Sequence, residues 1–543
     1  MQDWFRNAII YQADATHFQD SDGDGMGDLA GVTQRLPYLR GMGFTCLWLT
    51  PFYASPFRDG GYDVADHMTV DPRLGTLADM VALLEAADDL GIRIMVDLVA
   101  QHTSDQHPWF QAARRDRNSR YRDYYVWADE PEPTEVKPIF PTVEDSVWTW
   151  DETAGQYYRH VFYRHEPDLN LANPEVREEI YRIMSFWLRL GVAGFRVDAA
   201  AHMIERAKAA DPRDDGYWLL NDMRAYVQAR RPDAVLFGEV DVPPDQYPPY
   251  FGQGHRLTLV SSFWLNNYLY LALARGAAEP LQRALRMQPR APANAQYAVW
   301  VRNHDELDLE RLTDQERAEV LRRFAPDENM RIYNRGIRRR LPPMLDGDTS
   351  WIALTHALVM SLPGVPIVRY GDEIGMGDDL SLSERHAVRT VMQWSDETNA
   401  GFSSADPAAL QVPLIRDGPY RYQEINVYRQ SLDESSLLAR IGKMTRARLG
   451  LRAMGSGRFR VLDTGCPSVL AIEHLGPARD ETIVTLANLA PEAVHITLPD
   501  VPIECMVDIL CDGRYERQDP RPHRLSLHGH GYRWLRRRQR DGG

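Results

Sequence analysis

Eight short apolar runs, separated by longer amphipathic stretches, constrain the fold of this chain more than any other feature. Each run is rich in Val, Ile, Leu or aromatic residues, as expected of buried strands. The stretches between them, such as LADMVALLEAADDLG (77–91), carry apolar residues at three- and four-residue spacing and end in Gly, as helices do. Strands that alternate with helices predict a parallel sheet, and eight repeats predict a closed (β/α)8 TIM barrel. The expected strands are 8–14, 46–51, 92–100, 194–200, 234–240, 257–264, 297–306 and 366–375.

Two parts of the chain depart from this alternation. Residues 103–172 are rich in Trp, Tyr, Pro and charge and are too long for a plain loop, so we expect a small inserted domain after the third strand. Beyond about 440, runs such as SVLAIEHL (468–475) are spaced like antiparallel strands without long helices, which predicts a β-sandwich. The predicted organisation is therefore a barrel from 1–102 and 173–439, an inserted domain from 103–172 and a C-terminal β domain from 440–543.

Charge and composition exclude several classes of function. The formal charge is −15, so neither nucleic acid nor an anionic membrane is an expected partner. No apolar run approaches the ~20 residues of a membrane span, and the start MQDWFRNAIIYQ has no signal-peptide pattern. Four scattered cysteines predict neither a disulfide framework nor a zinc site. We therefore expect a cytoplasmic protein without an organic cofactor. The sequence leaves open whether the protein forms a homo-oligomer. The basic run RRRQR (536–540) is expected to be a solvated tail.

The stretch DSDGDGMGD (20–28) places acidic residues at alternate positions with glycines between them. An EF-hand would need a bidentate carboxylate at its twelfth position, but the twelfth residue is Gly31, and AIIYQADATHF before the loop resembles a strand. A hard cation such as Ca²⁺ could still bind, because alternate oxygens on a tight loop converge. A solvated acidic turn is the alternative. The predicted ligands are the side chains of Asp20, Asp22, Asp24 and Asp28 and the carbonyl of Met26.

Polar residues stand at the carboxyl ends of four of the expected strands. Barrel enzymes place their working groups at this end of the strands, so residues from distant parts of the sequence are expected to meet there. Singly, each could instead cap the helix that follows its strand; jointly they indicate a catalytic site. They are His102, Arg196, Asp198, Glu239, His304 and Asp305.

Three carboxylates without a catalytic cysteine, a serine elbow or a phosphate loop favour glycosidic chemistry. Cleavage of a sugar acetal needs one ionised carboxylate at the anomeric carbon and one protonated carboxylic acid at the leaving oxygen, about 5 Å apart in retaining enzymes. The third carboxylate can hold sugar hydroxyls and raise the pKa of the acid. Arg196 lies two residues before Asp198 on the same strand face and is expected to keep Asp198 ionised.

The motifs GFRVDAA (194–200), FGEV (237–240) and VRNHDE (301–306), in this order, resemble the α-amylase superfamily (glycoside hydrolase family 13) of retaining α-glucoside enzymes. The resemblance spans nearly the whole chain. It implies that Asp198 is the nucleophile, Glu239 the general acid/base and Asp305 the transition-state stabiliser. It also implies a glucose subsite lined by His102, Arg196 and His304.

The same resemblance assigns two further features. Asp63 in GGYDVADH and Arg385 in SERHAVRTVMQW match an Asp–Arg pair that closes the pocket around the non-reducing glucose in members that act on short sugars. The loop 20–28 is similar to the structural calcium loop of oligosaccharide-type members, so the resemblance implies bound Ca²⁺.

Residues 300–404 resemble one family within this superfamily, the trehalose synthases, which interconvert maltose and trehalose. The segments that carry it are NHDELDLERLT, YNRGIRRRLPPMLDGD, SLPGVPIVRYGDEIGMGDD and VRTVMQWS. It implies glucosyl transfer within a closed site, with hydrolysis as a side reaction. Two alternatives stay open: an α-glucosidase or transglucosidase acting on a small disaccharide such as maltose, sucrose or trehalose, and a non-catalytic binding protein on the same barrel.

Some residues depart from these patterns. Gln101 replaces the usual Asn before His102, which speaks against a second calcium site near the inserted domain. The residues after Asp198 and Glu239 differ from those of trehalose synthases and are expected to affect the choice of acceptor, whereas the small Ala199 resembles α-1,4-acting relatives. Four tryptophans of the inserted domain could stack on the acceptor sugar or belong to its core: Trp109, Trp127, Trp148 and Trp150.

Overall fold

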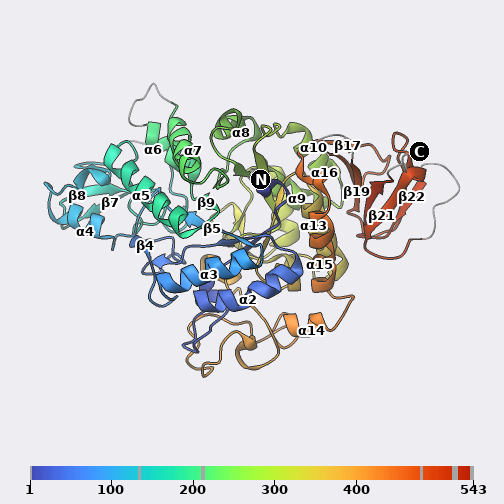
Figure 1. The fold of residues 1–543 in the computed structure, drawn as a ribbon, viewed down its shortest axis with the longest axis horizontal. Coiled ribbons are helices and arrows are strands. Elements are labelled where there is room, and N and C mark those ends of the chain that lie inside the picture. The colour runs from blue at the N-terminus through green and yellow to red at the C-terminus, as the bar shows by residue number, and fades with distance from the viewer. Residues whose placement is uncertain (1–2, 132–135, 209–214, 477–480, 516–523, 539–543) are drawn as a thin grey trace.

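The computed structural model describes residues 3–131, 136–208, 215–476, 481–515 and 524–538. Its centre is a closed barrel of eight parallel strands, flanked by the inserted domain at one end of the molecule and the C-terminal β domain at the other (Figure 1). The predicted fold class, a (β/α)8 barrel, is confirmed. The seventh and eighth barrel strands each start one residue earlier than expected, at Gln296 and Val365. The barrel strands are β1 (Ile10–Ala13), β2 (Cys46–Leu49), β5 (Arg93–Leu98), β9 (Gly194–Val197), β10 (Val235–Gly238), β11 (Leu259–Ser261), β12 (Gln296–Trp300) and β16 (Val365–Arg369).

Side chains alternate between the two faces of each barrel strand. Ile10 points into the barrel, whereas Tyr11 packs in the layer between the strands and the helices, as the two-residue period of a strand requires. Phe5, from the short 3-10 helix η1 (Trp4–Asn7), packs in the same interior cluster as Ile10. The barrel interior is therefore a packed core, and polar side chains are left for its carboxyl end. The interior residues include Cys46, Trp48, Met95, Val235, Phe237, Leu259, Ala298, Trp300, Val365 and Ile367.

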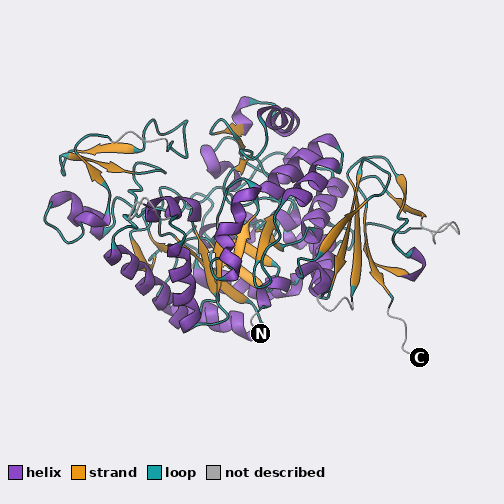
Figure 2. Ribbon diagram, turned by 90° about the horizontal axis from the view of Figure 1, so that it is seen from above, coloured by secondary structure: helices purple, strands orange, loops and turns teal. Residues whose placement is uncertain are grey.

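Helices surround the barrel in Figure 2, which views it from above. Several begin with side-chain caps that satisfy the free amides of the first turn: Asp28 caps α2, and Thr76 forms a capping box with Asp79 at α3. No helix in the described ranges is long and apolar enough to cross a membrane. The main helices are α2 (Leu29–Met42), α3 (Leu77–Asp89), α5 (Pro174–Leu190), α6 (Ala200–Lys208), α7 (Trp218–Arg230), α8 (Tyr247–Phe251), α9 (Phe263–Arg275), α10 (Glu279–Met287), α13 (Thr349–Ser361) and α15 (Leu437–Leu449).

Two excursions stand over the carboxyl end of the barrel. The first, after β5, holds α4 (Pro108–Arg115) and a three-stranded sheet ordered β6-β8-β7; Phe110 stacks on Trp127 in its core, with ring centroids 5.5 Å apart. The second, after β12, has no strand or helix pattern that the sequence analysis recognised. The elements of the second excursion are β13 (Leu307–Asp308), α11 (Asp314–Phe324), β14 (Arg331–Ile332), β15 (Gly336–Ile337) and α12 (Leu341–Met344). The sheet of the first excursion consists of β6 (Trp127–Ala128), β7 (Trp148–Asp151) and β8 (Gln156–Arg159). A separate two-stranded sheet pairs β3 (Tyr53–Ala54) with β4 (Asp66–Val70).

The C-terminal β domain consists of a five-stranded antiparallel sheet, ordered β17-β18-β19-β23-β21, and the pair β20-β22. Both contribute to one apolar core, so the predicted sandwich is present. The run 536–540 is only partly a tail, because Arg536 and Arg537 belong to β23 and residues 539–540 lie outside the described residues. The strands are β17 (Phe459–Leu462), β18 (Val469–Leu475), β19 (Thr482–Asn488), β20 (Val494–Thr497), β21 (Met506–Cys511), β22 (Arg524–Leu527) and β23 (Tyr532–Arg537).

The three domain boundaries remain predictions. The boundary expected at 440 falls inside α15, which contacts the barrel helices α2 and α13, and α16 (Arg452–Gly455) leads from it to β17. The four cysteines are free thiols, and none forms a disulfide.

Candidate active site

A cavity of about 360 Å³ opens at the carboxyl ends of the barrel strands, between the two excursions. Its size suits a small ligand. Carboxylates that follow β9, β10 and β12 reach it, together with three histidines and two arginines. Among the residues that line it are Asp59, Tyr62, His102, Phe140, Phe162, Asp198, His202, Glu239, Phe263, His304, Asp305, Arg335 and Arg385.

Arg196 connects the acidic residues at the base of this cavity. Its Nη1 donates to Asp198 and, at 2.9 Å, to Oδ1 of Asp97, whereas Nη2 lies 2.6 Å from Oε1 of Glu239. Arg196 is 2% exposed, so these charges interact in a medium of low polarity. Asp198 and Glu239 thus share one guanidinium, as expected for two groups that act on the same bond; their predicted separation remains a prediction.

Burial raises the pKa of both carboxyl groups, so the expectation that Arg196 keeps the pKa of Asp198 low is not met. Burial raises the pKa of Glu239 to about 7; Arg196 opposes this shift, and Asp198 and Asp305 add to it. Burial also raises the pKa of Asp198, against the attraction of Arg196. Glu239 Oε2 accepts a hydrogen bond of 3.0 Å from the amide of Ala199, whose φ of 48° is a strained conformation for a non-glycine residue. The environment therefore suits Glu239 to a general acid.

Asp305 is held on both of its oxygens, by two arginines on Oδ1 and by His304 on Oδ2. Its Oδ1 accepts from Nη1 of Arg385 at 2.7 Å and from Nη2 of Arg389 at 3.0 Å, and Oδ2 lies 3.1 Å from Nε2 of His304. Burial alone would raise the pKa of Asp305, but His304, Arg385, Arg389 and Arg196 together lower it well below its usual value. Asp305 is therefore ionised throughout the working pH range.

His304 and His102 are neutral and fixed in place. Nδ1 of His304 accepts from the amide nitrogen of Gln12 at 2.7 Å, so Nε2 carries the proton toward Asp305. Burial lowers the pKa of His304 to about 3, and its ring stacks on Tyr62 with centroids 5.1 Å apart. His102 lines the same cavity, with Nε2 3.3 Å from the carbonyl of Tyr62. These rings form a flat wall against which a sugar can lie.

The predicted pairing of Arg385 with Asp63 is wrong. Arg385 Nη2 donates instead to Asp59 Oδ1 at 2.6 Å, and Asp59 lines the cavity. Asp63 is fully buried and accepts from Ser55 Oγ at 2.9 Å and from the amides of Arg58 and Asp59. Its oxygens are therefore used to hold the loop, whereas Asp59, placed by that loop, takes the role expected of Asp63.

The four tryptophans of the inserted domain do not line the cavity. Trp109 and Trp127 pack in the aromatic core of that domain, Trp148 is buried, and Trp150 is 48% exposed. The cavity walls come from other aromatic residues, Phe140, Phe162 and Phe263. Of the two alternatives left open for these tryptophans, stacking on the acceptor sugar is therefore not supported.

The family model of the α-amylase catalytic domain matches residues 11–336 and 338–457. The chain belongs to the α-amylase family. The trehalose synthase of Pimelobacter sp. (strain R48) is 39% identical to it over 549 residues, covering 98% of this chain and 96% of that protein. The trehalose synthase/amylase TreS of Mycobacterium tuberculosis (strain CDC 1551 / Oshkosh) is 40% identical over 545 residues, or 98% of this chain and 90% of that protein.

Solved structures show the same relationship. The crystal structure of the α-amylase from H. orenii has a TM-score of 0.80 to this chain at 26% identity, covering 98% of this chain and 99% of that one. Together with the sequence relatives, it confirms the predicted resemblance and identifies a glycoside-active enzyme.

The acidic loop of this α-amylase family enzyme brings three predicted metal ligands together. Carboxylate oxygens of Asp20, Asp22 and Asp28 lie within 4.8 Å of one another, an arrangement that suits a hard cation. Asp24 is also on the loop and accepts a 2.8 Å hydrogen bond from the amide of Met26. Burial and the charges of Asp22, Asp20 and Asp28 raise the pKa of Asp24, and bound Ca²⁺ would neutralise this crowding.

Sequence reasoning missed Asp59, Asp97 and Arg389. Asp97 lies on β5, where its carboxylate accepts from Arg196 and, at 2.7 Å, from Nε1 of Trp48. A charged residue inside the apolar run IRIMVDLVA was a signal that this strand faces a cation. For Asp59 the signal was the following Gly60-Gly61 pair, both with positive φ, which marks a tight turn.

Proposed function

We propose that this enzyme interconverts maltose and trehalose by moving a glucosyl unit through a covalent intermediate on Asp198. The observation that carries the chemistry is the pair Asp198 and Glu239 on one buried guanidinium, with the pKa of Glu239 raised to about 7. The choice of sugars is supported by the similarity to trehalose synthases, which extends over 98% of the chain.

In the first step, an oxygen of Asp198 attacks the anomeric carbon while Glu239 gives its proton to the glycosidic oxygen. The bond between the two glucose units breaks, and a glucosyl ester on Asp198 and a free glucose form. Asp305, ionised and held by Arg385 and Arg389, would accept hydrogen bonds from hydroxyls of the donor glucose. Asp59, which pairs with Arg385, would contact hydroxyls at the closed end of the pocket.

In the second step, the freed glucose turns in the cavity and presents its anomeric hydroxyl. Glu239, now ionised, removes the proton from that hydroxyl, and the oxygen attacks the anomeric carbon of the ester, so Asp198 leaves and the trehalose linkage forms. Contacts between the excursions favour retention of the glucose: Arg335 donates to the carbonyl of Ile139 at 2.8 Å, and Tyr163 and Tyr333 hydroxyls are 3.1 Å apart. Both contacts cross from the inserted domain to the second excursion.

The second candidate is hydrolysis of a small α-linked disaccharide. It uses the same first step, after which water instead of glucose attacks the ester. The relative named trehalose synthase/amylase favours keeping this alternative.

The acidic loop is proposed to hold structural Ca²⁺ through Asp20, Asp22 and Asp28. Ser403 Oγ donates to Asp20 at 2.5 Å and the amide of Asp20 donates to the carbonyl of Phe402 at 2.9 Å. A cation there would secure the segment after β1 against residues 402–403, away from the residues that line the cavity.

Incubation with maltose, trehalose and sucrose, followed by sugar chromatography, tests the proposal. Trehalose from maltose is expected, and ¹³C-labelled free glucose added to the mixture should not enter the trehalose. Glucose as the only product would support the hydrolase instead. No change in any of the three sugars would overturn both.

A further inference from the structure

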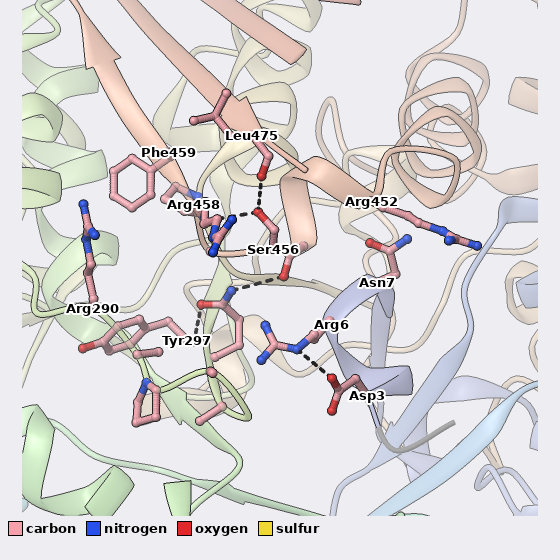
Figure 3. A pocket seen from close by; sticks show the side chains of 18 of the residues that line it. Asp3, Arg6, Asn7, Arg290, Tyr297, Arg452, Ser456, Arg458, Phe459 and Leu475 are labelled. Atoms are coloured by element: carbon pink, nitrogen blue, oxygen red, sulfur yellow. Dashed lines mark hydrogen bonds and ion pairs between the residues drawn. The ribbon is translucent and has the colours of Figure 1, made fainter. Parts of the chain in front are cut away.

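A second cavity lies at the opposite end of the barrel from the active site. Its volume is about 870 Å³, and it is enclosed by η1, by the loop 288–297 before and at the start of β12, and by residues 452–459, which lead into the C-terminal domain (Figure 3). Gln296 begins β12 at this cavity, whereas Asn303 follows the end of β12 at the active site. At ~3.3 Å per residue the two cavities are on the order of 20 Å apart, so they are separate sites.

Positive charge dominates this cavity. Among the described residues, four arginines and one aspartate are the charged residues that line it, in a chain whose formal charge is −15. Figure 3 shows Arg6, Arg290 and Arg458 spread around the cavity, with Arg452 beyond Asn7. Cations gathered in a concave site raise the local concentration of anions.

Arg6, Arg290 and Arg452 are only partly neutralised by the described part of the protein. Arg6 Nε lies 3.4 Å from Asp3, which is itself exposed, and Nη2 of Arg6 is buried without a hydrogen-bond acceptor in the described part of the chain. Arg290 and Arg452 are exposed and have no carboxylate partner among the described residues. Donors without acceptors in a walled cavity are available to a ligand with several negatively charged oxygens.

The walls of the cavity are fixed by the junction between barrel and C-terminal domain. A Cβ on Gly455 would lie 2.3 Å from the carbonyl of Arg6, so the two backbones approach as closely as glycine allows. Ser456 Oγ donates to the carbonyls of Ala453 and Leu475 at 2.7 Å each, and Gln296 donates to the carbonyl of Gly455 at 3.4 Å. The backbone that carries Arg6 and Arg452 is therefore held in place at this junction.

We propose that this cavity binds a phosphate dianion, either inorganic phosphate or the phosphate group of a small phosphorylated sugar. Several arginines around one space match a group with two charges and three acceptor oxygens, which guanidinium groups bind in pairs of hydrogen bonds. The volume is within the range of small-molecule sites and leaves room for a sugar beside the phosphate. Phe459, half-buried in the wall, offers an apolar face for that sugar.

Isothermal titration of the full chain with inorganic phosphate, glucose 6-phosphate and succinate, at constant ionic strength, tests this proposal. Saturable binding of phosphate, of glucose 6-phosphate or of both is expected, with a rise in Tm; the tighter of the two identifies the source of the phosphate. Arg6→Gln and Arg290→Gln should each weaken binding about tenfold or more, the effect of losing one charge-assisted pair of hydrogen bonds.

Arg322→Gln is the matched control, because Arg322 is an exposed arginine on α11 that does not line the cavity; it should leave binding unchanged. Ala293→Trp places a bulky side chain at the cavity but keeps every arginine, and it should also weaken binding. Circular dichroism without phosphate checks the fold of each variant. The proposal is overturned by the absence of saturable binding, by equal or tighter binding of succinate, or by equal loss of affinity in Arg322→Gln.

Discussion

The two large cavities of the barrel differ in how their charges are arranged. At the carboxyl end, the 360 Å³ cavity has arginines that are almost fully buried and paired with carboxylates, as Arg196 and Arg385 are. At the opposite end, the 870 Å³ cavity has mostly exposed arginines facing one aspartate. Buried, mutually coupled charges shift pKa values and indicate chemistry, whereas exposed like charges indicate at most binding. The pairing of buried arginines with carboxylates, more than the volume of the cavity, thus distinguishes the catalytic end of the barrel from the opposite end.

The largest effect should come from removing the nucleophile. Asp198→Asn keeps the size of the side chain but cannot form the glucosyl ester, so kcat on maltose should fall by about 10⁴-fold or more. Initial rates by sugar chromatography measure it, and an unchanged Tm shows that the fold is intact. Activity near that of the unmodified enzyme would mean that the paired charges at the carboxyl end do not perform the reaction.

The second prediction concerns the proton of Glu239. Because its pKa is raised to about 7 and the protonated form is the acid, kcat/KM should fall about tenfold per pH unit above that pH. Glu239→Gln should lower kcat by about 10²- to 10⁴-fold and remove this alkaline fall. A pH profile of the variant that kept the same fall would assign the titration to another group.

The third prediction separates the residue found in the cavity from the one expected there. Asp59→Asn removes a charge that pairs with Arg385 and should lower kcat/KM for maltose about 10- to 100-fold, as loss of a charged hydrogen bond does. Asp63→Asn, the matched control, should act mainly on stability, because its oxygens bind only the loop in the described structure. Thermal melts and Michaelis kinetics distinguish the two. A larger loss of kcat/KM in Asp63→Asn than in Asp59→Asn would show that Asp63, and not Asp59, acts in the active site.

The smallest effect is expected at the acidic loop, where carboxylates gather without an arginine partner in the described structure. Removal of Ca²⁺ with a chelator should lower Tm by about 3 °C, since a cation bound only to the folded state stabilises it by about 3 kcal/mol at a hundredfold excess over Kd. Added Ca²⁺ should restore Tm. A Tm that does not respond to either would favour the solvated acidic turn.

The barrel could be predicted because each of its strands is a continuous apolar run buried on both faces. The second excursion could not, since strands of two residues, such as β13 and β15, have no period to detect. They are held by charges instead: Arg335 binds both Asp308 and Glu306. Pairings of this kind depend on how the chain folds and leave no local pattern.

The residues that sequence reasoning placed correctly in the cavity follow regular strands. Asp198 and Glu239 directly follow β9 and β10, where position along the strand fixes direction, whereas Asp305 lies in the irregular segment after β12. Asp59 and the aromatic walls belong to irregular segments. There the sequence analysis chose Asp63, four residues from Asp59, and did not identify the aromatic residues. The direction of a side chain in a loop depends on every turn of the backbone. Here the turn at Gly60 and Gly61 lies between Asp59, which lines the cavity, and Asp63, which does not.

Carboxylates outnumber arginines among the residues that line the active site, with Asp241, Glu306, Asp308 and Glu310 added to those already discussed. This excess makes the pocket attractive to small molecules that carry both hydroxyls and a protonated amine, because they imitate a sugar and neutralise the site at once. Amine buffers with several hydroxyls would therefore act as competitive inhibitors, and affinities for disaccharides measured in them would be underestimated.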